Sequence, residues 1–340
     1  MTDLVLLTGI SGFLGGHTAL QLLKSGYKVR GSLRSLDRAD EVRDTMQSHG
    51  ADTDNLEFVT LDLLSDDGWD DAMKGARYVQ HTASPFITRM PADKMELITP
   101  AVEGTRRALD AALKADVEHI VLTSSMAAIM YGHERTRTAP FTEDDWTNIN
   151  SPDANAYTQS KTLAEKKAWE LVEDAGRRDD LRVINPSFIM GPLLNADPGT
   201  SGAIILRLLK GEMPAAPRLS FPCVDVRDVA ALHVMAMTST KAAGRRHATS
   251  ADNLTLLEMA QALKTQLPAY AKKLPKFEIP DWIVRIAALF DADARGSIAE
   301  LGHHRTVDAS LARALLGRDF IAPQKAVAAI GQSLVDHNLA

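Results

Sequence analysis

The chain has a single cysteine, no long apolar run and no excess of basic residues. One cysteine excludes an intramolecular disulfide, and we expect Cys223 to be a small buried apolar side chain. No run reaches the ~20 apolar residues that cross a bilayer, so we expect no membrane partner. The formal net charge of −6, with acids and bases interspersed, argues against a nucleic-acid partner.

The first residues, MTDLVLLTG, lack the basic segment and the longer apolar run of a signal peptide. A lone cysteine without metal-ligand spacing suits a reducing compartment and predicts no metal site. We therefore expect a cytoplasmic protein, and either a monomer or a homodimer. With 340 residues, 45% of them hydrophobic, the chain suffices for one large α/β unit or two domains.

Short apolar runs alternate with helix-length amphipathic segments in the first half of the chain. The predicted strands are Leu4–Thr8, Tyr27–Leu33, Leu56–Leu61, Tyr78–Ala83, His119–Thr123 and Arg182–Ile184. The predicted helices are Phe13–Lys24, Arg38–His49, a short one near Trp69–Met73, Ala101–Lys114 and Tyr157–Ala175. This alternation predicts an α/β fold with a doubly wound parallel sheet and right-handed crossovers.

The pattern changes after about residue 186, where Pro and Gly recur in NPSFIMGPLLNADPG and GEMPAAPRLSFP. These stretches predict loops and short elements rather than further strand–helix units. Later helices are predicted at Leu254–Leu267 and Lys325–Leu334. We predict a first domain over residues 1–186, with a possible return near 225–250 through a strand at Arg246–Thr249, and a smaller domain over 187–340.

The first predicted strand and helix enclose the glycine turn TGISGFLG. Gly9 permits a tight turn, Gly12 lets a pyrophosphate approach the backbone, and Gly15 lets the helix pack closely on the sheet. In this setting the motif predicts a dinucleotide site in a Rossmann-type sheet, with the phosphates at the helix N-terminus. The residues expected to bind the cofactor at this turn are Thr8, Gly9, Ser11, Gly12, Phe13, Leu14 and Gly15.

Arg34 ends the second predicted strand, where NAD enzymes usually carry an acid for the ribose 2′-hydroxyl. No acid occurs between Gly26 and Leu36. A guanidinium pairs bidentately with a phosphate and gains nothing comparable from a neutral hydroxyl. The sequence therefore predicts NADP(H), and the alternative is a solvated surface arginine. Arg30 and Arg38 are weaker candidates for the same anion.

Further cofactor contacts are expected where the third and fourth strands end, because ligands bind outside the carboxyl ends of parallel strands. Asp62 is expected either to accept a hydrogen bond from the adenine amino group or to cap the following helix. His81 is expected to be structural. The other candidates at these strand ends are Leu63, Thr82, Ala83 and Ser84.

Tyr157 and Lys161 lie one helical turn apart on a stripe that continues through Ala164 and Ala168. A lysine on an inward-facing stripe is unusual, because lysine is almost never buried unpaired. A nearby ammonium favours the phenolate and lowers the ordinary tyrosine pKa of about 10. The phenol can then protonate a carbonyl oxygen as hydride arrives. Ser125 follows the fifth strand and can hold that oxygen against Tyr157.

Together with Ser125, the segments TGISGFLG and YTQSK resemble those of the extended short-chain dehydrogenases/reductases. HTASPF, FTEDDW, YTQSKTLAEKKAW, INPSFIMGP and VDVRDVAALHVMAM resemble the branch of dihydroflavonol reductase, cinnamoyl-CoA reductase and microbial aldehyde and ketone reductases. The resemblance runs from residue 4 to about 240. It implies Ser125, Tyr157 and Lys161 as the catalytic residues, and Pro186 and Ser187 near the nicotinamide amide. Many relatives carry an asparagine in the helix after the fourth strand, and ITPAVEGTRRALDAA has none.

These features predict NADPH-dependent reduction of an aldehyde or ketone, with the proton from Tyr157. Methionines and aromatics favour a small hydrophobic carbonyl substrate. The pocket side chains are expected to include Phe86, Met126, Met130, Tyr131, Phe188, Met190 and Phe221. One alternative is a nucleotide-sugar epimerase or dehydratase that retains NAD, against which Arg34 argues. The other is a non-catalytic NADP-binding sensor, which would not need Tyr157 and Lys161.

Overall fold

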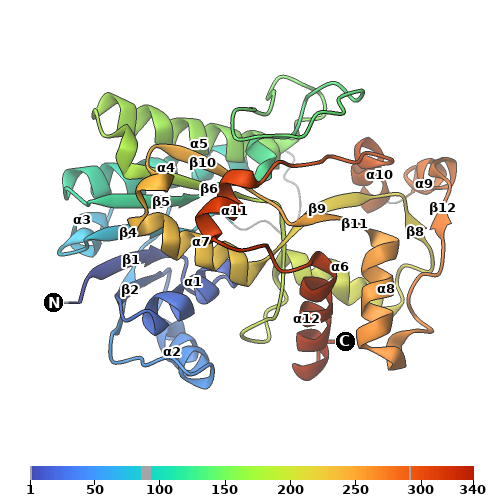
Figure 1. Ribbon diagram of the computed structural model, residues 1–340, viewed down its shortest axis with the longest axis horizontal. Helices are drawn as coiled ribbons and strands as arrows, with labels where there is room; N and C mark the ends of the chain where they lie inside the picture. Colours follow the sequence, from blue (N-terminus) through green and yellow to red (C-terminus); the bar gives the residue numbers. More distant parts are fainter. Residues whose placement is uncertain (1, 86–92, 291) are drawn as a thin grey trace.

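The computed structural model describes residues 2–85, 93–290 and 292–340. Its largest element is a seven-stranded parallel sheet with the strand order β10-β6-β5-β4-β1-β2-β3 (Figure 1). Its strands are β1 (Leu4–Thr8), β2 (Lys28–Leu33), β3 (Leu56–Thr60), β4 (Tyr78–His81), β5 (His119–Thr123), β6 (Leu181–Pro186) and β10 (Arg245–Thr249). The predicted doubly wound Rossmann-type sheet is confirmed, and its strand order reverses between β1 and β4.

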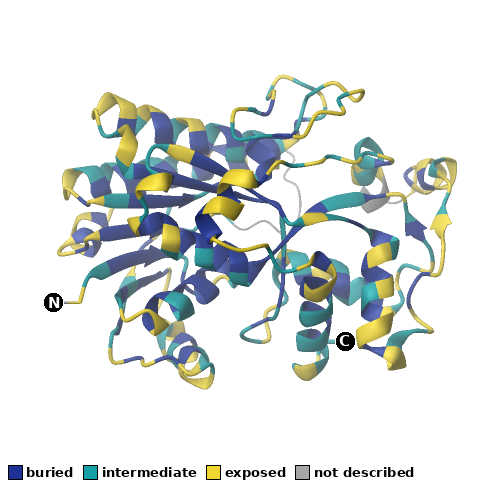
Figure 2. Cartoon of the chain, viewed as in Figure 1, coloured by how far each residue is buried: buried dark blue, intermediate teal, exposed yellow. Residues whose placement is uncertain are grey.

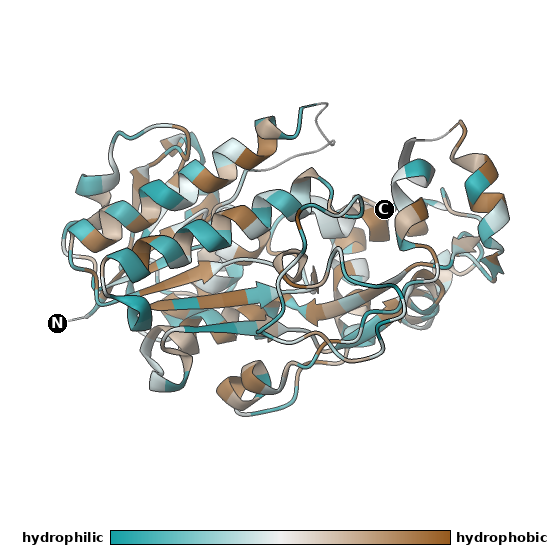
Figure 3. Cartoon of the chain, turned by 90° about the horizontal axis from the view of Figure 1, so that it is seen from above, coloured by the Kyte–Doolittle hydropathy of each residue, from teal (hydrophilic) through white to brown (hydrophobic). Residues whose placement is uncertain are grey.

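The strands of this sheet are rich in apolar residues because helices cover both faces. On one face pack α3 (Trp69–Met73), α4 (Met95–Lys114) and α5 (Ala156–Asp174). On the other pack α1 (Phe13–Lys24), α2 (Ala39–Ser48), α7 (Val226–Thr238) and α11 (Ser310–Leu316). Val5 and Leu7 of β1 face the second group and Leu6 faces the first, since successive side chains of a strand alternate. Figure 2 shows the resulting buried strands, and Figure 3 looks onto two long helices above them.

A smaller unit begins at the carboxyl ends of the large sheet, because only Ser187 separates β6 from β7. Its three-stranded sheet has the order β11-β9-β7. The strands are β7 (Phe188–Met190), β9 (Ser220–Asp225) and β11 (Asp252–Thr255), and the main helices are α6 (Gly199–Lys210), α8 (Leu256–Gln266) and α12 (Pro323–Asp336). The shorter elements are β8 (Ala216–Pro217), β12 (Glu278–Ile279), α9 (Asp281–Ala287) and α10 (Ala292–Ser297). Among the helices that the structure describes, none is both long and apolar enough to span a membrane.

Two helices differ from the elements predicted from the sequence. Helix α4 begins at Met95 rather than after Pro100, so the proline lies inside the helix instead of at its start, where proline is more common. Helix α6 is not among the predicted helices, and it lies between the two stretches of recurring Pro and Gly that predict loops. Its apolar side, with Ile205, Leu208 and Leu209, is buried in the core of the smaller unit, which stabilises the helix.

The chain's only cysteine lies in β9, in the core of the smaller unit. Cys223 is fully buried, as expected from the sequence, and its Sγ lies 3.3 Å from the carbonyl oxygen of Phe221. Burial raises the pKa of this thiol to about 12. The side chain therefore behaves as part of the apolar packing.

Candidate active site

The turn between β1 and α1 leaves no space for a side chain at Gly9 or Gly15. Gly9 has a φ of +74°, and a Cβ at this position would lie 2.9 Å from the Cα of Ala83. A Cβ on Gly15 would lie 2.0 Å from the carbonyl oxygen of Gly9. Gly12 begins α1 without a side-chain cap. The first amides of α1 are therefore free to bind an anion such as a phosphate.

Thr8 ties this turn to the segment that follows β4. Its hydroxyl lies 2.8 Å from Nδ1 of His81 and accepts the amide of Ala83 at 3.1 Å, while its carbonyl oxygen accepts the hydroxyl of Thr82 at 2.6 Å. Burial, and then the nearby charge of Lys161, lower the pKa of His81 to about 4. His81 therefore stays neutral near pH 7 and helps to fix the geometry of the turn.

A cavity of about 740 Å³ lies where the large sheet meets the smaller unit. The sequence-predicted residues that line it are Ser11, Gly12, Phe13, Leu14, Thr82, Ser125, Met126, Met130, Tyr131, Tyr157, Lys161, Pro186, Ser187, Phe188 and Phe221. They come from the glycine turn, from the ends of β4, β5 and β6, from the start of α5 and from the smaller unit. The fold thus gathers candidate cofactor, catalytic and substrate residues around one space.

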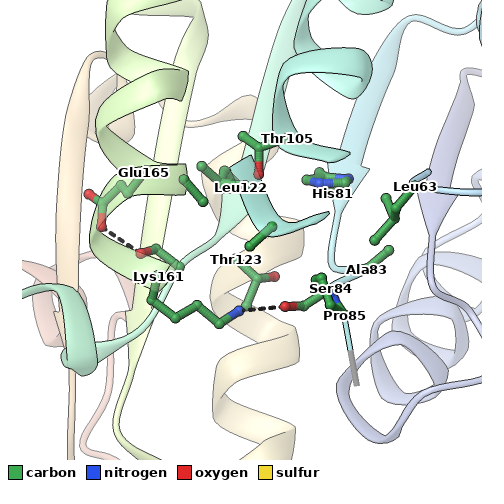
Figure 4. A pocket seen from close by; sticks show the side chains of 13 residues that line it. Leu63, His81, Ala83, Ser84, Pro85, Thr105, Leu122, Thr123, Lys161 and Glu165 are labelled. Carbon is green, nitrogen blue, oxygen red and sulfur yellow. Dashed lines mark hydrogen bonds between the residues drawn. The ribbon is translucent and has the colours of Figure 1, made fainter. Parts of the chain in front are cut away.

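Several other candidates lie outside this cavity. Leu63, Ala83 and Ser84 line a second cavity of about 20 Å³, which Lys161 also lines (Figure 4). Met190 is fully buried in the core of the smaller unit and does not line the cavity. Phe86 lies outside the described residues.

The two hypotheses for Asp62 differ in how they fit the structure. Its Oδ1 accepts the amide of Leu64 at 2.9 Å, so the side chain closes a local turn. The next helix, α3, has Gly68 as its N-cap. The expectation that Asp62 caps this helix is therefore wrong, because the intervening turn separates the two. Asp62 is exposed and follows the carboxyl end of β3.

The three arginines near the end of β2 are not equivalent. Arg30 is committed to the scaffold: its guanidinium pairs with Glu57 and donates to the carbonyl oxygens of Ala72 and Lys74. Arg38 pairs with Glu41 at 3.0 Å, with both side chains about half exposed. Arg34 is exposed, and its guanidinium makes no hydrogen bond or ion pair within the part of the chain that the structure describes.

Ser125 and Lys161 are both held by local contacts. Ser125 is the N-cap of a short 3₁₀ helix, Met126–Ala128, and its Oγ accepts the amide of Ala127 at 3.0 Å. This leaves the proton of the hydroxyl available for an oxygen in the cavity. The Nζ of Lys161 donates to the Oγ of Ser84 at 3.0 Å (Figure 4).

Tyr157 lies in the first turn of α5. Asn155 caps this helix by accepting the amide of Thr158 at 3.0 Å, which fixes where the helix begins. Tyr157 is 37% exposed and lines the cavity, so the phenol can reach a molecule bound there. Because Lys161 lies one turn further along the same helix, the two side chains share one wall of the cavity.

Sequence reasoning missed a polar group on the cavity wall, formed by Glu300 and Arg305. The two side chains form an ion pair, and the Arg305 guanidinium stacks 4.7 Å from the ring centre of Tyr131. Burial raises the pKa of Tyr131 to about 12, so its phenol stays protonated. These residues lie beyond the segments that resemble a known family, and no motif marks them. In the described ranges, no group of three His, Cys, Asp or Glu side chains is placed to hold a metal.

Comparison with known proteins agrees with this geometry. The family model named NAD dependent epimerase/dehydratase matches residues 5–249. An NADPH-dependent methylglyoxal reductase of Saccharomyces cerevisiae is 31% identical, over 80% of this chain and 84% of its own. A cinnamoyl-CoA reductase of Medicago truncatula is 35% identical, over 72% of this chain and 74% of its own.

Solved structures extend the comparison. Yeast methylglyoxal/isovaleraldehyde reductase in complex with NADPH superposes with a TM-score of 0.80 at 26% identity, covering 99% of this chain and 100% of the other. The Candida albicans counterpart in complex with NADPH gives 0.80 at 27% identity, covering 98% and 99%. This chain belongs to the NAD dependent epimerase/dehydratase family, within the extended short-chain dehydrogenases/reductases.

Proposed function

We propose that this protein reduces an aldehyde or ketone to an alcohol with NADPH, and that Tyr157 supplies the proton. The observation that carries the proposal is the single cavity shared by the glycine turn, Ser125, Tyr157 and Lys161. Relatives that are NADPH-dependent reductases, some of them solved with NADPH, identify the chain as an NADP-dependent oxidoreductase. The same relatives support carbonyl reduction as the reaction class.

The residues present fit this dinucleotide. The uncapped start of α1 and the bare surface of the glycine turn suit a pyrophosphate. The unpartnered guanidinium of Arg34, among the described residues, suits a ribose 2′-phosphate. Pro186 and Ser187 line the cavity at the end of β6 and would hold the nicotinamide amide. When bound, NADPH supplies the hydride.

The chain's own residues then handle the carbonyl oxygen. Tyr157 would donate its phenolic proton to this oxygen, and Ser125 would donate a hydrogen bond that orients it. The positive charge of Lys161 would stabilise the phenolate left behind, and its ammonium would also bind the nicotinamide ribose hydroxyls. The contact of Lys161 with Ser84 supports these roles by fixing where the ammonium lies.

The rest of the cavity supports a small, largely apolar substrate. Met126, Phe188 and Phe221 form apolar walls, and the Phe188 and Phe221 rings lie 5.5 Å apart between centres. An apolar pocket with a few polar groups favours a hydrophobic carbonyl compound.

Oxidation of NADPH and of NADH, measured in parallel against aromatic and aliphatic aldehydes and ketones, tests the proposal. We expect turnover with several carbonyl compounds and a clear preference for NADPH. An absence of turnover with either cofactor, together with NAD retained through purification, would instead indicate an epimerase or dehydratase. A preference for NADH would contradict the role given to Arg34.

A further inference from the structure

Helix α5 carries a third ionisable residue on the side that faces the sheet. Glu165 lies one turn after Lys161, and only 1% of it is exposed to solvent. Its carboxylate accepts hydrogen bonds from the Ser124 hydroxyl (2.5 Å), Nδ2 of Asn185 (2.7 Å), Nε1 of Trp169 (3.3 Å) and the Arg246 guanidinium. Because so many donors bind this buried charge, the carboxylate is held in one position.

Two hydrogen-bond partners of Glu165 are connected to Ser125, one as its neighbour in the chain and one through a hydrogen bond. Ser124, which donates to Glu165, is the residue before Ser125 (Figure 4 marks this bond to Glu165). Asn185 donates from one amide group both to Glu165 and to the carbonyl oxygen of Ser125, at 2.7 and 3.3 Å. Glu165 thus holds the backbone that carries the Ser125 hydroxyl.

Arg246 extends the same network to the residues that follow Ser125. Its guanidinium donates to the carbonyl oxygens of Ala128, Glu143 and Asp145, and stacks 3.7 Å from the ring centre of Trp146. Only 7% of Arg246 is exposed. The 3₁₀ helix that Ser125 caps is therefore anchored at both ends to the Glu165–Arg246 pair.

The network matters because Glu165 and Tyr157 belong to the same rigid helix. Any shift of α5 that moves Tyr157 also moves Glu165, and Glu165 moves the Ser125 segment with it. One buried carboxylate thus links the helix that carries Tyr157 to the segment that carries Ser125. A displacement of about 1 Å between reacting groups can lower a rate about 100-fold.

We propose that Glu165 is a positioning residue: through Ser124 and Asn185 it holds the Ser125 hydroxyl in register with Tyr157. The inference rests on the proposed carbonyl reduction. Glu165 itself touches neither cofactor nor substrate. The alternative is that the network only stabilises the fold, in which case its contacts would matter for unfolding and not for the function of Ser125.

Ser124→Ala is the sharpest test, because it removes one contact of Glu165 and leaves the Glu165–Arg246 pair intact. We expect kcat to fall roughly 10- to 100-fold, while the KM for the carbonyl substrate and the affinity for NADPH, measured by fluorescence titration, change less than about two-fold. Thr53→Ala is the matched control: it also removes a buried hydroxyl that forms a hydrogen bond, here with Gln47, and neither residue lines the cavity. It should leave kcat unchanged.

A double-mutant cycle with Ser125→Ala separates positioning from general stability. If Ser124 acts through Ser125, adding Ser124→Ala to Ser125→Ala should lower kcat less than two-fold further. An equal loss in both backgrounds would overturn the inference, as would an unchanged kcat in the single variant. If the wild-type protein shows no turnover, the proposed function itself fails. If the wild type turns over but the variants behave as described above, only the positioning role fails.

Glu165→Gln provides a second measurement. It should lower the unfolding temperature markedly, because it leaves the Arg246 charge buried without its partner. In protein that remains folded, kcat should fall at least as far as in Ser124→Ala. Full kcat in folded Glu165→Gln would contradict the positioning role. Should this variant fail to fold, the Ser124–Ser125 cycle still decides the question.

Discussion

The large sheet and the smaller unit each form a wall of one cavity, and they contribute different residues to it. The sheet unit supplies backbone groups and strand ends: a glycine turn, Ser125 after β5, and Tyr157 and Lys161 at the start of α5. The smaller unit contributes other residues, among them Phe221, Glu300 and Arg305. We infer that the first wall fixes the cofactor and the proton chemistry, whereas the second selects the substrate.

The largest effect should come from Tyr157→Phe, which removes a hydroxyl from the sheet wall. We expect kcat to fall about 10²- to 10⁴-fold, the usual contribution of a positioned general acid, with unchanged affinity for NADPH. Tyr270→Phe in the smaller unit removes a hydroxyl that donates to the carbonyl oxygen of Ala340 and should leave kcat intact. Near-normal turnover in Tyr157→Phe would show that the proton comes from elsewhere.

Arg34→Ala tests whether the sheet unit recognises the 2′-phosphate of the cofactor. The KM for NADPH should rise roughly 10- to 100-fold, because a hydrogen bond to a charged group contributes about 1.5–3 kcal/mol. The KM for NADH should stay constant, since NADH lacks the 2′-phosphate. Arg38→Ala is the matched control, because Arg38 is already paired with Glu41. Equal losses for both cofactors would assign Arg34 a structural role instead.

Stability should depend on pH mainly through the sheet unit, which buries several histidines. His233 is fully buried between Gln80 and Thr123, and burial lowers its pKa to about 3. An unfolded histidine binds a proton below about pH 6.5, while folded His233 does not. The free energy of unfolding is therefore highest above that pH, and falls below it by up to about 1.4 kcal/mol per pH unit for this histidine.

Urea unfolding of His233→Gln between pH 7 and pH 5 tests this pH dependence. The variant is expected to be less stable at pH 7, but its stability should fall less steeply with pH than that of the wild type. His304→Gln, an exposed position in the smaller unit, should keep the wild-type slope. An unchanged slope in His233→Gln would contradict the assignment.

The smallest effect is expected on the substrate wall. Arg305→Met should raise the KM roughly 2- to 10-fold for carbonyl substrates that carry a second polar oxygen, the contribution of an ordinary hydrogen bond. For purely apolar aldehydes the KM should not change. Arg313→Met removes a guanidinium that lies over the Phe320 ring outside the cavity, and serves as the control. A uniform KM increase for all substrates would indicate a collapsed wall rather than a lost contact.

The sheet could be predicted from the sequence because its signals are local. Strand-length apolar runs predict the strands, amphipathic segments predict the helices, and the glycine spacing predicts the tight turn between the first strand and helix. The catalytic candidates follow from the same logic, since Ser125 ends a strand and Tyr157 and Lys161 share a helix face.

The Glu165 network and the Arg305–Glu300 pair could not be found in this way. A glutamate within EKKAWE on a helix suggests a solvated surface, and its burial depends on Arg246, which arrives from a distant strand. Arg305 and Glu300 follow no motif, and only the fold of the smaller unit brings them to Tyr131. Both sets arise from long-range packing, on which periodicity carries no information.

The buried state of Cys223 has a practical consequence for studying motion between the two units. A fully buried thiol with a strongly raised pKa reacts very slowly with maleimides. The folded protein without introduced cysteines should therefore take up almost no maleimide label. Cysteines introduced at exposed Asp44 on α2 and Gln261 on α8 would then be the only fast-reacting positions. Fluorophores at this pair would report whether the cavity closes when NADPH and a carbonyl compound bind.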